Sequence, residues 1–190
     1  MKVLLLGDSL FARHEGKEIP HINHSLLARQ ADLQIDNRAV SGDNTFDLLN
    51  ILQGQSSWSA DYIFIIIGAN DLAIHKQVFL GEYLENLRRI VEILRRQISA
   101  NRICLISPPP VDEDLQAYRT NRLVAYYTEI MEQVASEEGV NFLSLRATFE
   151  KSGLTVKEIL RGQINDGLHF GSLGYELLAE AMLNIIGKRE

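Results

Sequence analysis

The sequence has few cysteines and no long apolar run. Its 190 residues include one cysteine, Cys104, which excludes an internal disulfide and any metal site built from several cysteines. Because Ile103 and Leu105 flank it, we expect Cys104 to be a small buried apolar residue rather than a nucleophile. No stretch approaches the roughly 20 apolar residues that a membrane-spanning helix needs, so no membrane span is predicted.

The start of the chain also lacks the features of a signal peptide. Lys2 is followed by an apolar run over residues 3–6, whereas the apolar region of a signal peptide takes about 7 to 15 residues. We therefore expect a cytoplasmic protein, unless a leader peptide has been removed from the chain. Hydrophobic residues make up 46% and charged residues 23%, as in ordinary globular proteins. This length and composition predict a single domain over residues 1–190.

Basic residues are fewer than acidic ones. Nineteen Lys and Arg against 25 Asp and Glu give a net charge of −6, and a nucleic-acid partner normally requires a basic surface. We therefore exclude nucleic acid as a partner. His21 and His24 could suggest a metal site, but no further ligand follows at a suitable spacing, so we interpret them as exposed residues at a helix start.

Apolar runs and periodic segments alternate along the chain, which predicts an α/β domain with a mostly parallel sheet covered on both faces. Strands are expected at about residues 2–7, 33–39, 62–67, 102–107 and 140–145. Helices are expected at about 21–31, after a cap at Asn44 or Thr45, at 81–100, at 115–138 and at 172–187, with a short helical stretch at 156–160.

The first strand ends at Gly7 and Asp8 and brings Ser9 to an edge of the sheet. A buried strand followed by an ordinary turn would look the same, so this segment alone decides nothing. However, parallel strands present their carboxyl ends at one edge, where ligands bind. Distinctive residues follow three other strands: Gly42 the second, Asn70 the third, and Asp166 with His169 the fifth.

Together these residues are the groups needed for acyl transfer. Ser9 is a nucleophile once a base removes its proton, and His169 is the candidate base because imidazole titrates near neutrality. Asp166, three residues earlier, can orient the imidazole ring. The Ser9 N–H, the Gly42 N–H and the Asn70 amide can bind the oxyanion. Each residue alone could be a turn or capping residue, but their order after successive strands favours catalysis.

The sequence resembles the SGNH hydrolases, also called the GDSL esterase and lipase family. The matching segments are GDSL at residues 7–10, Gly42 within NRAVSGDNT, GAND at 68–71 and DGLH at 166–169. The resemblance implies a flavodoxin-like sheet of order 2-1-3-4-5, with no metal and no organic cofactor. It also implies Ser9 as nucleophile, Asp166 and His169 as its triad partners, and Gly42 and Asn70 as oxyanion donors beside the Ser9 N–H.

Two related folds fit less well. An α/β-hydrolase would carry a GxSxG turn around its nucleophile, which Ser9 lacks. A dinucleotide-binding domain would carry GxGxxG after the first strand, which is absent too.

We therefore predict a lipase- or esterase-type acylhydrolase that cleaves small or single-chain carboxylic esters. Alternatives are a carbohydrate O-acetylesterase, or a non-catalytic carbohydrate- or lipid-binding module on the same fold. Nothing in the sequence indicates the oligomeric state. The expected pocket walls leave the same edge of the sheet as Ser9. His75 could reach the pocket from the loop after the third strand, but a solvated side chain is the preferred interpretation for it. These walls are Asp8, Leu10, Asp71, His75, Pro108 and Phe170.

Overall fold

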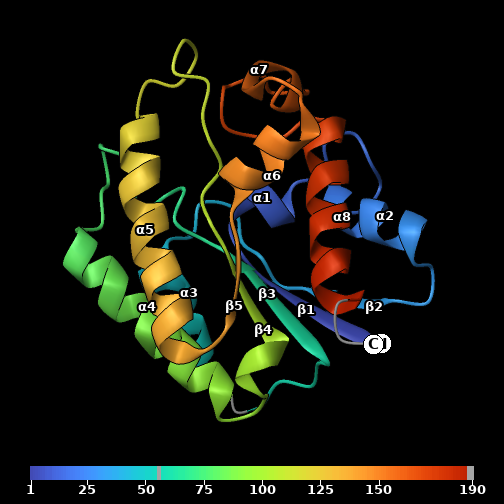
Figure 1. The fold of residues 1–190 in the computed structure, drawn as a ribbon, viewed down its shortest axis with the longest axis vertical. Coiled ribbons are helices and arrows are strands. Elements are labelled where there is room, and N and C mark those ends of the chain that lie inside the picture. The colour runs from blue at the N-terminus through green and yellow to red at the C-terminus, as the bar shows by residue number, and fades with distance from the viewer. Residues whose placement is uncertain (55–56, 188–190) are drawn as a thin grey trace.

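A parallel β-sheet forms the centre of the computed structural model, which describes residues 1–54 and 57–187 (Figure 1). Its strands lie in the order β2-β1-β3-β4-β5, and each neighbouring pair is parallel. The fold class and the strand order predicted from the sequence are confirmed. The strands are β1 (Lys2–Gly7), β2 (Gln34–Asn37), β3 (Tyr62–Ile66), β4 (Ile103–Ile106) and β5 (Asn141–Leu143).

Helices cover both faces of the sheet. On one face α3 (Thr45–Gln53), α4 (Leu80–Arg95) and α5 (Asn121–Glu138) pack side by side, and on the other α2 (His21–Arg29) packs against α8 (Ser172–Gly187) (Figure 1). The shorter helices α6 (Leu145–Ser152) and α7 (Val156–Ile159) contact α8. A 3₁₀ turn, η1 (Ala100–Arg102), precedes β4. The result is a three-layer arrangement of helices, sheet and helices.

The central strands are apolar because both of their faces are covered. Residues 3–6 of β1 and every residue of β3 and β4 are buried, which accounts for the nearly continuous runs of Leu and Ile in these segments. Gly7 at the end of β1 pairs with Ile66 at the end of β3. The two segments that follow, which carry Ser9 and Asn70, therefore start at the same edge of the sheet.

Several helix boundaries differ from the prediction. Helix α5 begins at Asn121 instead of 115, because the Thr120 side chain caps it by accepting from the N–H of Leu123. Helix α4 ends at Arg95 and not at 100. Helix α6 was not predicted; it begins where Ser144 accepts from the N–H of Ala147. Local capping hydrogen bonds thus set boundaries that apolar spacing alone does not reveal.

The prediction that His21 is exposed is wrong. Its side chain is buried and stacks on Tyr175, with ring centroids 4.7 Å apart. This stacking joins α2 to α8, so His21 belongs to the helix interface. His24 is exposed, as expected. Cys104 is buried, as its apolar neighbours predicted.

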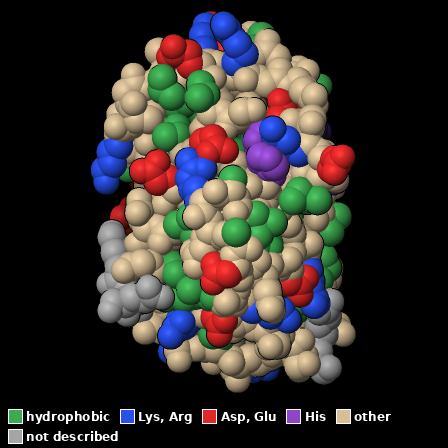
Figure 2. All heavy atoms as spheres, turned by 90° about the vertical axis from the view of Figure 1, so that its right-hand side faces the viewer, with side chains coloured by type: hydrophobic (Ala, Val, Ile, Leu, Met, Phe, Trp, Pro, Cys, Tyr) green, Lys and Arg blue, Asp and Glu red, His purple; other side chains and the backbone are tan. Residues whose placement is uncertain are grey.

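The molecular surface carries charges of both signs. Figure 2 shows acidic and basic side chains interspersed on the side that bears α2 and α8. Among residues 1–54 and 57–187, no helix combines the length and the apolar character that crossing a bilayer requires.

Candidate active site

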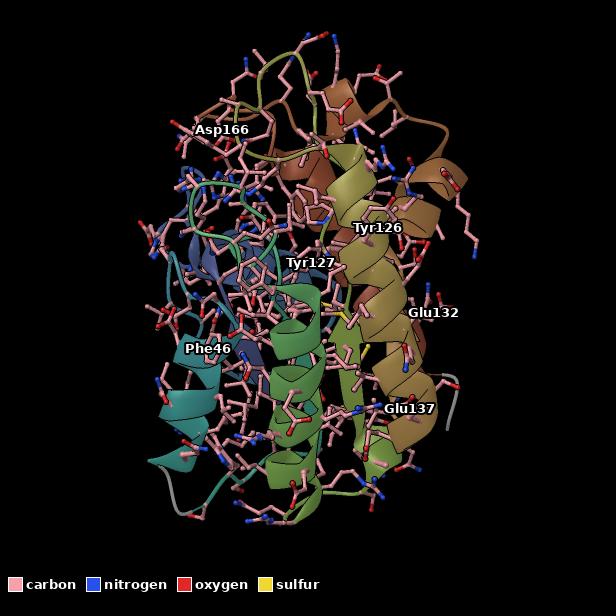
Figure 3. The ribbon with its side chains drawn as sticks, turned by 90° about the vertical axis from the view of Figure 1, so that its left-hand side faces the viewer. Phe46, Tyr126, Tyr127, Glu132, Glu137 and Asp166 are labelled. Atoms are coloured by element: carbon pink, nitrogen blue, oxygen red, sulfur yellow. The ribbon has the colours of Figure 1, made fainter. Side chains whose placement is uncertain are left out.

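One cavity of about 340 Å³ brings together the five residues predicted to carry the chemistry. It opens at the carboxyl end of the sheet. In Figure 3, Asp166 lies near the top of the molecule, above the first turn of α3, which Phe46 marks. The residues lining the cavity come from several loops: Ser9, Arg13, Ser41, Gly42, Asn70, Arg119, Asp166, Leu168 and His169.

Ser9, His169 and Asp166 form a continuous hydrogen-bonded chain. The Oγ of Ser9 lies 2.8 Å from Nε2 of His169, and Nδ1 of the same ring lies 2.8 Å from Oδ2 of Asp166. When Nδ1 carries the proton, it donates to the carboxylate and leaves Nε2 free to accept from the serine hydroxyl. This geometry allows His169 to remove the serine proton while Asp166 holds the ring.

The turn that carries Asp166 also fixes its carboxylate. Oδ1 of Asp166 accepts from the backbone N–H groups of Leu168 and His169, each at 3.0 Å, and Gly167 between them adopts φ +77°. Partial burial alone would raise the pKa of Asp166. The hydrogen bonds from the His169 ring and backbone, the attraction to His169 and the Leu168 N–H outweigh burial, so the pKa lies below its usual range. The carboxylate is thus ionised near neutral pH.

A tight turn between β1 and the short helix α1 (Ser9–Ala12) presents Ser9. Gly7 has φ +140°, and a Cβ at this position would lie 1.9 Å from the carbonyl oxygen of Ile66. Only glycine fits there. Asp8 caps α1, because its Oδ1 accepts from the N–H of Leu10 at 2.9 Å. Ser9 is therefore the first residue of a helix, and its own N–H has no acceptor within the helix.

Ser9, Gly42 and Asn70 line one cavity and come from three different segments, and each carries an N–H group. Within the described parts of the chain, the backbone N–H groups of Ser9 and Gly42 donate to no protein acceptor. Gly42 adopts φ +94°. The Nδ2 of Asn70 donates one hydrogen to the carbonyl oxygen of Asp43 at 2.8 Å, so its second hydrogen remains for a ligand. This set can bind an oxygen that gains negative charge.

Asp71 holds two of these loops together. Its buried Oδ1 accepts from both the N–H and the hydroxyl of Thr45, at 3.0 and 2.5 Å. Asn86 on α4 also donates to the Thr45 hydroxyl. The segment that carries Gly42 is thereby joined to the segment that carries Asn70. Burial raises the pKa of Asp71 to about 6 despite these hydrogen bonds.

None of the six residues expected as pocket walls lines the cavity. Asp8, Leu10, Asp71, Pro108 and Phe170 are buried, and none of them lines the cavity. The helical turn of α1 places the Leu10 side chain in the core, and Phe170 packs against the rings of Phe149 and Tyr175.

His75 also lies outside the cavity. Its side chain is exposed and packs against the ring of Tyr118, with centroids 4.3 Å apart.

Two arginines that the sequence did not single out line the cavity. Arg13 follows α1 and pairs with Glu15 at 3.1 Å. Arg119 donates from Nε to the carbonyl oxygen of Ala69 at 2.6 Å and from Nη2 to Oδ1 of Asn70 at 3.3 Å. The apolar spacing had placed Arg119 inside a helix, and only its position just before the capping residue Thr120 could have revealed a loop residue.

Known proteins resemble this chain over most of its length. The family model of the GDSL-like lipase/acylhydrolase family matches residues 5–177. Among curated relatives, an isoamyl acetate-hydrolyzing esterase 1 homolog of Bos taurus is 31% identical, with 99% of this chain and 82% of that protein covered. The isoamyl acetate-hydrolyzing esterase of Saccharomyces cerevisiae is 28% identical, with 97% of this chain and 85% of that protein covered.

Solved structures share the fold at lower sequence identity. A lipase/acylhydrolase from Enterococcus faecalis superposes with a TM-score of 0.81 at 22% identity, covering 99% of this chain and 96% of that one. An acetylxylan esterase from Geobacillus stearothermophilus gives a TM-score of 0.73 at 22% identity, covering 98% and 94%. The family match and the curated relatives decide the assignment: this chain belongs to the GDSL-like lipase/acylhydrolase family and is a hydrolase of ester bonds.

Proposed function

We propose that this protein hydrolyses carboxylic esters through an acyl-enzyme on Ser9, with His169 as base and Asp166 as the group that orients it. The observation that carries the proposal is the chain of two 2.8 Å contacts from the Ser9 hydroxyl through the His169 ring to the Asp166 carboxylate. A ligand-binding module would not need a nucleophile, a base, an orienting carboxylate and oxyanion donors in one cavity. The whole set therefore favours catalysis.

In the acylation half, Oγ of Ser9 attacks the ester carbonyl carbon while its proton passes to Nε2 of His169. The carbonyl oxygen becomes an oxyanion and accepts hydrogen bonds from the N–H groups of Ser9 and Gly42 and from Nδ2 of Asn70. Asp166 stabilises the resulting imidazolium through its 2.8 Å contact with Nδ1. The intermediate then collapses, His169 gives its proton to the departing alcohol oxygen, and an acyl-serine ester remains.

Deacylation repeats the same steps with water. His169 takes a proton from a water molecule, whose oxygen attacks the acyl carbon of the acyl-serine. The second tetrahedral intermediate uses the same oxyanion donors. When it collapses, the proton returns from His169 to Oγ of Ser9, and the carboxylic acid is released. No other reactant is needed.

The size and lining of the cavity favour short acyl groups. Its volume is about 340 Å³, and Leu168 is the one leucine or larger apolar side chain among its lining residues. A long acyl chain would gain little from burial there, since each buried methylene contributes about 0.8 kcal/mol only where it meets apolar surface. Relatives named for isoamyl acetate and for acetylxylan also act, by their names, on acetyl esters. We therefore favour acetyl and other short-chain esters.

Hydrolysis of p-nitrophenyl esters from acetate to laurate tests this proposal. We expect kcat/KM to be highest for the shortest chains and activity to be lost in Ser9→Ala. The exposed helix residue Ser136 offers a matched control, and Ser136→Ala should hydrolyse these esters like the wild type. Wild-type rates in Ser9→Ala would contradict the mechanism, whereas a rise in kcat/KM towards laurate would contradict the preference for short chains.

The nature of the alcohol group is a separate question, because a carbohydrate O-acetylesterase would use the same catalytic residues. Comparing alkyl acetates with acetylated xylo-oligosaccharides answers it. Higher kcat/KM on the sugar acetates would favour the carbohydrate esterase, and higher kcat/KM on the alkyl acetates would favour the simple ester hydrolase.

A further inference from the structure

Arg119 lies in the loop between β4 and α5 and is nearly buried, with 9% of its surface exposed. It lines the same cavity as the Ser9 hydroxyl. Nε donates to the carbonyl oxygen of Ala69 at 2.6 Å, Nη2 to Oδ1 of Asn70 at 3.3 Å, and Nη1 to Oε1 of Gln116 at 3.2 Å. Burying a guanidinium whose three hydrogen-bond acceptors are all neutral costs free energy, because no carboxylate that the structure describes pairs with it directly.

The contacts determine which way the Asn70 amide faces. A guanidinium can only donate hydrogen bonds, so the amide atom next to Arg119 must be the oxygen. The carbonyl oxygen of Asp43 can only accept, so the amide atom at 2.8 Å from it must be the nitrogen. Without the arginine, Oδ1 of Asn70 would lose this buried donor. Arg119 thus favours the orientation in which Nδ2 keeps one hydrogen for the substrate.

The charge of Arg119 acts in the same direction. A cation beside Oδ1 polarises the amide and makes Nδ2 a stronger donor, and the effect is larger where water is excluded. Burial lowers the pKa of Arg119, while the carboxyl groups of Asp8 and Asp166 raise it. An arginine stays charged under these conditions. The oxyanion would therefore form near a fixed positive charge.

Gln116 connects Arg119 to the segment that carries Asp166. Its Oε1 accepts from Arg119, and its Nε2 donates to the backbone carbonyl of Asp166 at 2.9 Å. One short segment, residues 116–119, therefore contacts both Asn70 and Asp166. These two residues are far apart in the sequence, and they need a fixed distance if both are to act on one substrate.

We propose that Arg119 is a positioning residue for ester hydrolysis, which acts through Asn70 by holding and polarising its amide. The inference rests on the proposed function of Ser9, His169 and Asp166. Arg119 lies outside the four sequence segments that resemble the SGNH hydrolases.

A double-mutant cycle tests the proposal with a short-chain p-nitrophenyl ester. Removing one oxyanion donor typically lowers kcat about 100- to 1000-fold, which we expect for Asn70→Ala. Arg119→Ala should lower kcat roughly 10- to 100-fold while KM changes by less than about threefold. In the Asn70→Ala background, Arg119→Ala should cost less than about threefold more, because the group through which it acts is already gone.

Further measurements separate this role from a purely structural one. The affinity for a trifluoromethyl ketone, whose serine adduct carries an oxyanion, should fall with kcat in Arg119→Ala. Arg119→Lys keeps the charge but lacks the fork of donors, so it should recover part of the lost rate. Arg122 is an exposed arginine nearby that contacts Tyr126, and Arg122→Ala should behave like the wild type.

If Arg119→Ala lowered kcat by the same factor with and without the Asn70 side chain, the inference would be overturned. The proposed function would still stand in that case. If Ser9→Ala and Asn70→Ala both kept wild-type rates, the proposed function would fail, and the inference with it. Should Arg119→Ala not fold by circular dichroism, the same cycle is run with Arg119→Lys. Additive losses in that cycle would refute the role just as directly.

Discussion

The carboxyl group of Asp8, next to Ser9 in the chain, is fully buried, and only one of its two oxygens accepts a hydrogen bond from the part of the chain that the structure describes. Its Oδ1 accepts from the N–H of Leu10 at 2.9 Å, but Oδ2 has no hydrogen-bond partner among the described residues. Burial raises the pKa of Asp8 to about 7. The Leu10 N–H opposes this rise, the neighbouring Asp71 adds to it and Arg119 again opposes it. Folding therefore depends on the protonation of this group.

The direction of the effect follows from the two pKa values of Asp8. Well below pH 3.8 the carboxyl is protonated in both the folded and the unfolded chain, so its ionisation does not reduce the free energy of unfolding. As the pH rises, the unfolded chain ionises near 3.8 while the folded protein keeps its proton until about 7. At about 1.36 kcal/mol per pH unit, the wild type loses up to about 4 kcal/mol of unfolding free energy over this range.

Asp8→Asn removes this dependence, because an amide does not ionise but can still accept from the N–H of Leu10. Its stability relative to the wild type should therefore increase by up to about 4 kcal/mol between pH 4 and pH 8. Urea unfolding followed by circular dichroism measures the difference at each pH. Asp32→Asn, at an exposed carboxylate, is the control and should show a much smaller change. A difference that is constant with pH, or that shrinks as the pH rises, would refute the reasoning.

Two further predictions concern catalysis and stability. Asp166→Asn keeps an acceptor for the backbone N–H groups but presents an amide N–H to Nδ1 of His169, so kcat should fall about 10⁴-fold with little change in Tm; a loss below about tenfold would contradict the role of Asp166. In Gly7→Ala the new Cβ would meet the Ile66 carbonyl at 1.9 Å, so urea unfolding should show a loss above about 3 kcal/mol. The control Gly81→Ala, at a helix position open to solvent, should gain up to about 1 kcal/mol, and equal stability of the two variants would contradict this account.

The sheet and the meeting of its loops were predictable because they follow from burial and strand direction. Runs such as residues 62–66 are apolar because both faces of the sheet are covered. Once the strands are parallel, the segments after β1 and β3 must start at one edge. Residues as far apart in the sequence as Ser9 and His169 could therefore be expected to meet, and their side chains lie 2.8 Å apart.

Side-chain direction could not be predicted in the same way. Leu10 and Phe170 flank site residues in the sequence, yet the turn of α1 and the packing around α8 bury both side chains. Arg119 was missed for a related reason. The apolar spacing extended the following helix to 115, whereas the Thr120 cap begins it at 121 and leaves Arg119 in a loop. Such details depend on tertiary packing and on single capping bonds, which residue periodicity does not carry.

The central claim is that Ser9 is a nucleophile activated by His169. Labelling the folded protein with a fluorophosphonate, followed by peptide mass spectrometry, tests it most directly. The account predicts one adduct, on Ser9, that is absent in Ser9→Ala and forms far more slowly in His169→Ala. A folded wild type that takes no label, or takes it on another serine, would contradict the account.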